Sequence, residues 1–320
     1  MRLNIPRFDS NESAFLSRQL DFIKEKTYDI KYAELKCRKL IPINTSVDPG
    51  AERIFYRTYN QSGMAKIISN YADDLPRSQV TGQEFFINVH NIGESYGYNF
   101  QELRAAVYAQ MPLEQREAAA ARRAIAQREN LIAFFGDPNY NMLGFLNNPN
   151  CTTLTLPADG MGPLGTGVPN GSGLGSKAWA NKTPDQILRD MNLIANTPVT
   201  TSFGVEIADT LLLPMVNYNY AANTARSINS DTTILNFFLN NNPYIKMVEW
   251  VNELATAGVG NTTRAVAYRR DPDALTLEIP SDFEQLELEK RGLEYVVDCI
   301  ERIGGVIIYY PLSVCYSDGM

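Results

Sequence analysis

The chain has 320 residues, of which 44% are hydrophobic and 20% are charged, so it is a globular protein with one large domain or two ordinary ones. Its 36 acidic and 29 basic side chains give a formal charge of −7. This balance argues against a protein whose main task is to bind nucleic-acid phosphates, although it allows one that lies close to nucleic acid.

The charge is unevenly distributed along the chain. Residues 1–40 carry a net charge of +3, and the remaining residues carry −10. Residues 271–301 hold ten acidic and two basic side chains. We interpret this acidic stretch as a solvated face, with contact to basic residues of a neighbouring copy as the alternative.

The sequence also bears on the cellular compartment. Its start has no continuous apolar stretch, so we expect no signal peptide, and no run of about 18 apolar residues predicts a membrane-spanning helix. The four cysteines are far apart and form no CxxC pair, which predicts buried thiols rather than a disulfide framework. They are Cys37, Cys151, Cys299 and Cys315.

The only histidine, His90, limits the possible chemistry. Zinc sites of the HExxH type and paired-histidine relays need more than one histidine, and no GxSxG motif is present. His90 lies on the polar side of an alternating strand pattern, so we expect it to form a surface or interface hydrogen bond. We expect no catalytic residue, metal site or cofactor.

The first third of the chain predicts segments that lack a core of their own. Residues 13–34 have apolar side chains at near-helical spacing, which predicts an amphipathic helix in a leading arm. Aromatic and β-branched residues predict strands at 52–59 and 84–92. Residues 60–83 between them are too many for a tight hairpin and too apolar for a solvated tail. We therefore expect a projecting arm that is buried on another chain.

The middle of the chain predicts its longest helix. A short helix at 99–109 precedes one at 112–135, which has proline in its first turn and no glycine before Gly136. This helix would be about 35 Å long, and its narrow alanine seam would let another element approach closely. Residues 160–175 contain seven glycines and two prolines and predict an irregular loop.

The last part alternates helices and strands. Thr183, Pro184 and Gln186 predict the start of a helix with a capping box. Further segments predict a strand at 209–214, helices at 214–225 and 232–240, and strands near 244–250, 264–270 and 275–279. Residues 294–316 predict two buried strands separated at Gly304-Gly305. The fold class is α+β, with no repeated βα unit.

Two short motifs could be mistaken for functional sites. Residues 160–165 match GxGxxG after a short strand, but the residues that follow cannot begin a helix to hold a pyrophosphate. We interpret them as a flexible loop. Asp73 and Asp74 are adjacent on the predicted arm and lack the buried pocket that acid–base catalysis needs, so we expect solvated or salt-bridged charges.

Several short motifs follow one another along nearly the whole chain. They are Gly50-Ala51-Glu52-Arg53 with Tyr56; Gly63-Met64-Ala65 with Asp74, Leu75 and Pro76; Tyr98 with Glu102-Leu103; the AAAARRAIAQREN helix; Phe135-Gly136-Asp137; Leu143-Gly144-Phe145-Leu146-Asn147; Leu211-Leu212-Leu213-Pro214; Ile279-Pro280-Ser281-Asp282-Phe283; and Arg302-Ile303-Gly304-Gly305-Val306 with Pro311. In this order they resemble the major capsid proteins of tailed bacteriophages, whose shell fold is named after phage Hong Kong 97. The resemblance is closest to one subfamily of phage and prophage capsid proteins.

The resemblance implies a division of the chain into regions. An N-terminal arm would cover 1–45 and an extended E-loop hairpin 46–92. A peripheral (P) domain would cover 93–183, with the spine helix at 112–135 and the Gly-rich loop at 157–178. An axial (A) domain would cover 184–270, and the late strands at 271–320 would return to both domains.

The resemblance also implies a function without catalysis. The chain would be the major capsid subunit that self-assembles into pentamers and hexamers of an icosahedral head around double-stranded DNA. Its partners would be its own copies, a portal protein, separate scaffolding and decoration proteins, and packaged DNA by non-specific proximity, with no membrane. It would reside in the virion capsid after assembly in the bacterial cytoplasm. An acidic body suits a DNA container, because a strongly basic lining would bind the DNA tightly.

We predict intersubunit contacts at two sets of side chains. The set on the hairpin is Arg53, Tyr56, Met64, Ile67, Tyr71, Asp74 and Arg77, and the set on the spine helix is Arg116, Arg122 and Arg123. Some relatives form an isopeptide cross-link from an E-loop lysine to an asparagine, and here only Lys66 could supply it. An encapsulin-type nanocompartment shell is the nearest alternative function, and a nucleotide-dependent soluble enzyme is a more distant one.

Overall fold

The computed structural model describes residues 31–67, 75, 77–109, 113–159, 175–227 and 231–320. The chain divides into two compact units, Met1–Glu34 and Leu35–Met320. Residues 31–34 of the first unit form no helix or strand, and the predicted helix at 13–34 falls mostly outside the described residues. All elements discussed below belong to the second unit. Among the described residues, no helix combines the length and apolar character needed to cross a membrane.

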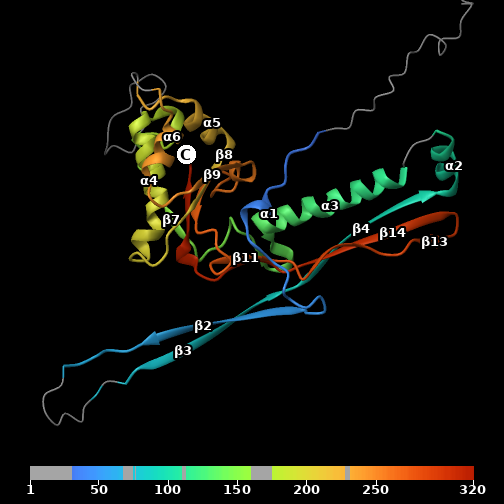
Figure 1. Cartoon of the computed structure of the whole chain (residues 1–320), viewed down its shortest axis with the longest axis horizontal. Coiled ribbons are helices and arrows are strands. Elements are labelled where there is room, and N and C mark those ends of the chain that lie inside the picture. Colours follow the sequence, from blue (N-terminus) through green and yellow to red (C-terminus); the bar gives the residue numbers. More distant parts are fainter. Residues whose placement is uncertain (1–30, 68–74, 76, 110–112, 160–174, 228–230) are drawn as a thin grey trace, which may run out of the picture. The chain divides into compact units, whose positions relative to one another are not determined.

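A long helix packed on an antiparallel sheet forms one part of this unit (Figure 1). Helix α3 (Leu113–Phe135) lies along strands β4 (His90–Asn99) and β14 (Glu294–Ile303), which pair over their full length. Ala121 and Ile125 of the helix pack against Val297 and Cys299 of the sheet. Small alanine side chains permit this close approach, as the sequence predicted.

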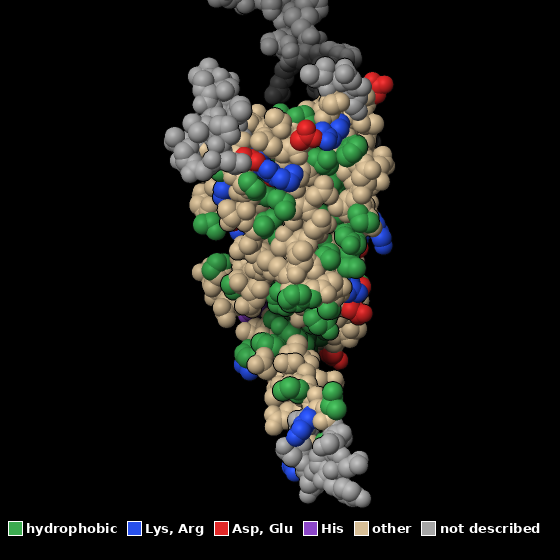
Figure 2. All heavy atoms as spheres, turned by 90° about the vertical axis from the view of Figure 1, so that its left-hand side faces the viewer, with side chains coloured by type: hydrophobic (Ala, Val, Ile, Leu, Met, Phe, Trp, Pro, Cys, Tyr) green, Lys and Arg blue, Asp and Glu red, His purple; other side chains and the backbone are tan. Residues whose placement is uncertain are grey.

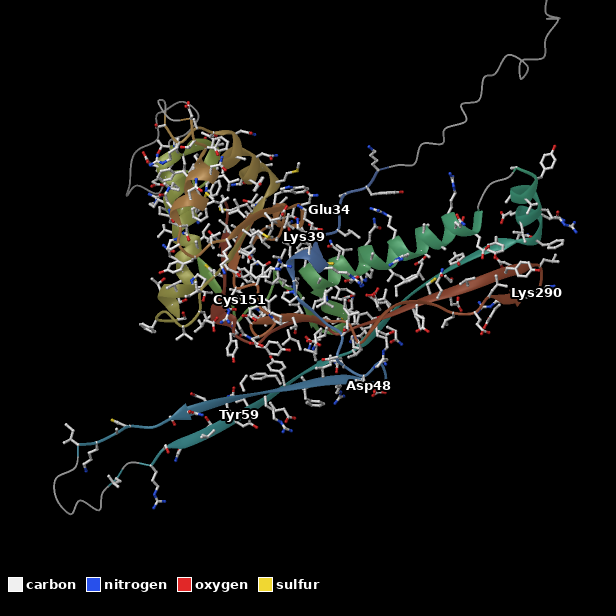
Figure 3. The ribbon with its side chains drawn as sticks, in the orientation of Figure 1. Glu34, Lys39, Asp48, Tyr59, Cys151 and Lys290 are labelled. Carbon is white, nitrogen blue, oxygen red and sulfur yellow. The ribbon has the colours of Figure 1, made fainter. Side chains whose placement is uncertain are left out.

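The same sheet carries two short strands and a capped helix at its ends. Strands β12 (Ser281–Gln285) and β13 (Glu289–Arg291) both pair with β14. Lys290 of β13 is labelled in Figure 3, at the end of the hairpin that β13 forms with β14. Helix α2 (Phe100–Tyr108) follows β4 directly. The Asn99 side chain accepts a hydrogen bond from the backbone of α2, and Glu102 reciprocates in a capping box.

A five-stranded sheet with helices forms the second part of the unit. Its strand order is β7-β16-β10-β8-β9. The bounds are β7 (Thr152–Leu154), β8 (Thr210–Pro214), β9 (Met247–Val251), β10 (Arg264–Tyr268), β16 (Val314–Asp318), α4 (Pro184–Thr201), α5 (Met215–Asn223) and α6 (Ile234–Asn241). Ile187, Met191 and Ile194 of α4 are fully buried in the same apolar cluster as Leu211 and Leu213 of β8. The predicted capping box at Thr183 and Gln186 is confirmed.

A three-stranded sheet and a short helix join these two parts. Strand β11 (Leu275–Glu278) lies between β1 (Ile43–Asn44) and β15 (Gly305–Ile308), beside helix α1 (Cys37–Leu40). The hydroxyl of Tyr268 donates a hydrogen bond of 2.6 Å to the carbonyl of Leu40. The largest apolar cluster of the unit spans α1, α3, β10, β11 and β16, so the two parts share one core.

A two-stranded ribbon leaves this core. Strands β2 (Arg53–Ser62) and β3 (Gln79–Asn88) pair with each other in an unbroken antiparallel register and with no other described strand. The prediction of one strand over 84–92 was wrong, because the strand is interrupted at Val89 and residues 90–99 form β4, which pairs with a different strand. The Val89 amide donates to the Glu52 carbonyl at this break, at 2.9 Å.

The end of α3 requires glycine. Gly136 has a φ of +69° and begins β5 (Gly136–Asp137), which pairs with β6 (Met142–Leu143). A Cβ atom on Gly136 would lie 2.1 Å from the Met142 carbonyl oxygen, so any other residue would have to displace backbone. This tight turn reverses the chain directly after the spine helix.

The acidic stretch and the C-terminal tail differ in part from their predictions. Residues 294–316 contain β14, β15 and the start of β16 rather than two strands. Glu278 and Glu301 of the acidic stretch are buried, at 0% and 1% exposure, so the solvated-face prediction is wrong for these two residues. The four cysteines are buried free thiols, as predicted.

Candidate intersubunit surfaces

The outer end of the ribbon exposes aliphatic side chains. Met64 is 78% exposed and Ile67 is 98% exposed, while Val80 on β3 is 63% exposed. A ladder of ten residue pairs extends about 33 Å, which separates these side chains from the core at the ribbon's base. Tyr59, labelled in Figure 3, is exposed on the same ribbon. The ribbon therefore presents an apolar surface that its own chain leaves uncovered in the described residues.

The base of the ribbon is fixed to the core on one face. Tyr56 stacks on Phe85 with ring centroids 5.3 Å apart and meets Tyr309 edge to face at 5.3 Å. Burial raises the pKa of the Tyr56 hydroxyl. The Arg302 guanidinium donates hydrogen bonds to the carbonyls of Pro49 and Ala51, which hold the start of the ribbon. Tyr56 thus packs within its own chain, and its contact with a neighbouring copy stays a prediction.

A variant of Tyr56 tests this role. We expect Tyr56→Ala to loosen β2 and β3 from the core and to destabilise that contact by about 1–3 kcal/mol, because both aromatic contacts are lost. Amide hydrogen exchange of β2 and β3 would measure the effect. Tyr56→Phe keeps both ring contacts and should exchange like the unmodified protein. Equal exchange in the alanine variant would show that the ring does not hold the ribbon.

A groove lies between the ribbon base and the core. Its volume is about 760 Å³, and it is lined by Phe85 and Phe86 of β3, by Leu143 of β6 and by Tyr310. These four side chains are between 42% and 55% exposed. The open face of the ribbon base also carries Arg53, whose guanidinium lies 5.4 Å from the Phe86 ring centre. The groove and the open face together extend the apolar surface of the ribbon tip.

The predicted arginines of the spine helix differ in environment. Arg116 and Arg122 are exposed, and Arg123 is half-buried. The Arg122 guanidinium lies 5.7 Å from the Phe283 ring centre on β12, so Arg122 contacts its own sheet. Contacts of these residues with a neighbouring copy remain predictions.

The remaining predicted residues of the hairpin are placed only in part. Lys66 and Arg77 are exposed on the segments that continue β2 and precede β3. Tyr71 and Asp74 lie outside the described residues, as do Asp73 and the GxGxxG stretch at 160–165. His90 is half-buried with its ring 4.9 Å from that of Tyr140, so it packs against an aromatic ring at the start of β4.

Sequence reasoning missed a second exposed apolar surface at the end of α4. Phe203 is 96% exposed and Val205 is 74% exposed. The loop is held by the Ser202 hydroxyl, which accepts a hydrogen bond of 2.8 Å from the Glu206 amide. Phe203 adopts a φ of +54°, which is unusual for a bulky residue. Figure 2 shows hydrophobic side chains gathered on this side of the unit. The FG pair after a helix was the only signal in the sequence.

Two further observations concern metal-ligating and nucleophilic side chains among the described residues. Among them, no group of three or more histidine, cysteine, aspartate or glutamate side chains is arranged to hold a metal ion. Burial raises the pKa of the Cys37 thiol to about 12 and that of Cys151 to about 11, so neither is an activated nucleophile.

A comparison with protein families identifies one match. The family model described as "Major capsid protein" matches residues 63–320, from the tip of the ribbon to the last strand. No curated protein sequence matches the chain.

Solved structures share the fold over almost the whole chain. A chain from the capsid of Myoviridae phage XM1 matches with a TM-score of 0.81 and 18% identity, covering 96% of this chain and 99% of the other. A structure of Mycobacterium phage Bobi matches with a TM-score of 0.61 and 13% identity, covering 94% and 96%. A virus-like particle from Pyrococcus furiosus matches with a TM-score of 0.52 and 11% identity, covering 90% and 92%. At these identities the structural matches establish the fold alone.

Proposed function

Since this chain belongs to the major capsid protein family and is a shell-forming structural subunit, we propose that its copies assemble into the pentamers and hexamers of an icosahedral phage head. The head would enclose double-stranded DNA and reside in the virion after assembly in the bacterial cytoplasm. Its partners would be other copies of the chain, a portal protein, and separate scaffolding and decoration proteins.

The observation that carries this proposal is the ribbon of β2 and β3. A two-stranded ribbon is marginal in water by itself, because it has two open edges and no core. Here its tip exposes Met64 and Ile67 about 33 Å from the base. A subunit of a closed shell needs such an element, because each copy can bury it on the next one and symmetry repeats the contact.

The regions of the fold support specific roles. We assign the E-loop to 46–92, the P-domain to 93–183 and the A-domain to 184–270, with an arm at 1–45 and late strands at 271–320. In support, β2 and β3 fall in the first range, α2 and α3 fall in the second, and α4, α5 and α6 fall in the third, while β4 (His90–Asn99) crosses from the first range into the second. The late strands contribute β14 to the helix-covered sheet and β16 to the five-stranded sheet.

We expect Ile67→Asp to abolish assembly while leaving the fold intact. The side chain is 98% exposed in the isolated chain, so the substitution removes no substantial contact with the described residues. In the shell it would place a charge in an apolar interface, where an unpaired buried charge costs several kcal/mol. Electron microscopy and analytical ultracentrifugation would measure the assembled fraction, and circular dichroism would measure folding.

The matched control is Ile67→Leu, which keeps an aliphatic side chain of the same volume. It should assemble like the unmodified protein. If Ile67→Asp formed shells at the same protein concentration, the ribbon tip would not be an intersubunit contact. If the unmodified chain stayed monomeric even with the other head proteins present, the shell proposal itself would fail.

The nanocompartment alternative predicts different contents. A shell of that kind would retain a cargo enzyme, whereas a phage head would take a portal and DNA. The family match supports the capsid assignment. Mass spectrometry of the contents of purified particles distinguishes the two: a portal protein and DNA would support the phage head, and a cargo enzyme without either would overturn it.

A further inference from the structure

Four charged side chains from four different elements meet at the junction of α1 with the helix-covered sheet. The Nε atom of Arg38 on α1 donates to Glu129 of α3 at 2.8 Å. One Nη atom donates to Asp282 of β12 at 2.7 Å and lies 3.4 Å from Glu301 of β14. One guanidinium therefore faces three carboxyl groups.

Two of these carboxyls are removed from water. Glu129 and Glu301 are each 1% exposed, whereas the Asp282 side chain is 62% exposed. Asp282 is the partner whose charge the solvent can screen. Its pKa is held below the ordinary value, chiefly by its hydrogen bonds with Arg38. Glu129 and Glu301, which solvent does not screen, therefore both depend on the Arg38 guanidinium for charge balance.

The other charged groups nearby are engaged elsewhere. Lys36 and Lys39, on either side of Arg38, both donate to Glu249 of β9, at 2.8 and 2.9 Å. Arg122 of α3 approaches Asp282, and Arg302 donates to backbone carbonyls at the ribbon base. On β4, the residue paired with Glu301 is the apolar Ile92. Within the part of the chain that the structure describes, the cation that contacts Glu301 is Arg38, at 3.4 Å.

The electrostatic consequence agrees with this geometry. The pKa of the Glu301 carboxyl is raised to about 8, chiefly by burial and also by the negative charge of Glu129. A hydrogen bond between the two carboxyls contributes in the same direction. Glu301 is the member of the pair that carries the proton at neutral pH.

We propose that a proton on Glu301, facing Glu129 and Arg38, fastens α1 to α3 and β14, and that losing this proton in mildly alkaline solution releases α1 from that side. Hydroxide removes the proton from the Glu301 carboxyl as water, which leaves two buried carboxylates facing each other. Arg38 can balance only one of them. Lys36 and Lys39 keep their contacts with Glu249, so the contact of α1 with β9 persists while its contact with α3 weakens.

Cys37 reports this release directly. Its thiol is 3% exposed and lies 3.8 Å from Glu129, at the face of α1 that would open. Cys151 precedes β7 and lies apart from Lys39 of α1 in Figure 3, so it serves as an internal reference. Both thiols have raised pKa values, so their thiolate fractions increase in parallel with pH and the ratio of their labelling rates cancels this effect.

The experiment is pulsed iodoacetamide labelling of the full-length protein, with mass spectrometry of the Cys37 and Cys151 peptides from about pH 6.5 to about pH 9.5. The Cys37 to Cys151 ratio should rise at least about fivefold through pH 8 in the unmodified protein. In Glu301→Gln, which keeps the shape of the protonated side chain, it should change less than about twofold. Asp282→Asn alters the exposed member and should keep the rise.

An equal rise in Glu301→Gln, or a flat ratio in the unmodified protein, would overturn the proposal. If Glu301→Gln does not fold, Glu129→Gln removes the other half of the pair and should flatten the ratio as well. The inference concerns a single subunit and does not depend on shell assembly, so it can fail while the proposed function stands.

Discussion

Asp190→Ala is expected to lower the free energy of unfolding by about 3–5 kcal/mol, measured by urea denaturation of the unassembled subunit. The Lys182 ammonium and the Asp190 carboxylate lie 2.5 Å apart, and both side chains are 0% exposed. Removing Asp190 leaves Lys182 buried, with the Pro157 carbonyl at 2.8 Å and Asp159 at 3.6 Å as its remaining partners. Asp159 is already paired with Arg189 at 2.5 Å, so its longer contact only partly offsets the desolvation of the Lys182 ammonium.

A double variant separates the two contributions. Lys182→Met with Asp190→Leu removes both charges and keeps the volume, so it should recover most of the stability lost in Asp190→Ala. A matched surface variant is Arg291→Ala, whose ion pair with Glu289 is more than half exposed, so its loss should change the free energy of unfolding far less. If Asp190→Ala lowered the free energy of unfolding no more than Arg291→Ala does, an unpaired Lys182 would carry no large cost.

The second large effect is a pH dependence that one carboxyl controls. The pKa of Glu301 is about 8 in the folded chain against 4.5 as its ordinary value, so the folded state holds a proton that the unfolded state releases. The stability contributed by this proton is fully present below pH 4.5 and is lost as the pH rises through about 8. The shift corresponds to about 3–5 kcal/mol.

The measurement compares Glu301→Gln with the unmodified protein in urea at matched pH values. Other titrating groups contribute equally to both proteins, so the difference isolates Glu301. The two should be similar near about pH 5, and the glutamine variant should be more stable by about 3–5 kcal/mol near about pH 9. A difference that does not change with pH would assign Glu301 an ordinary pKa.

Local patterns predicted most elements of the fold. The helix at 112–135 lacks glycine and internal proline, and α3 occupies Leu113–Phe135. The cap at Thr183 and the helix at 99–109 were also predicted, because side-chain capping acts within one turn. The family resemblance stated from the order of motifs is confirmed by the family match over residues 63–320.

The errors arose where tertiary pairing overrides local pattern. The alternation over 84–92 continues through Val89, yet β3 and β4 join different sheets there. Glu301 sits in a run of acidic residues that composition alone describes as solvated, yet it is 1% exposed where Arg38 of α1 approaches β14. No local pattern connects Tyr56 with Tyr309, 253 positions later, on which its ring packs; the contact of Tyr56 with a neighbouring copy stays a prediction.

The candidate surfaces were predictable in kind and less so in detail. The apolar composition of 60–83 indicated a projecting arm, and the structure leaves Met64 and Ile67 exposed. The exposed loop at Phe203 was not predicted, because an isolated aromatic residue is more often buried.

The position of α1 has a consequence for synthesis of the chain on the ribosome. Arg38 and Glu301 are separated by 263 residues, so the charged junction cannot close until almost the whole chain has emerged. At roughly 5–20 residues per second, translation delays this contact by about 13–50 seconds after Arg38 has been made. α1 can therefore complete this junction only after α3 and most strands of the five-stranded sheet have been produced. Because β16 follows Glu301 in the chain, the charged junction and the five-stranded sheet are both completed near the end of synthesis.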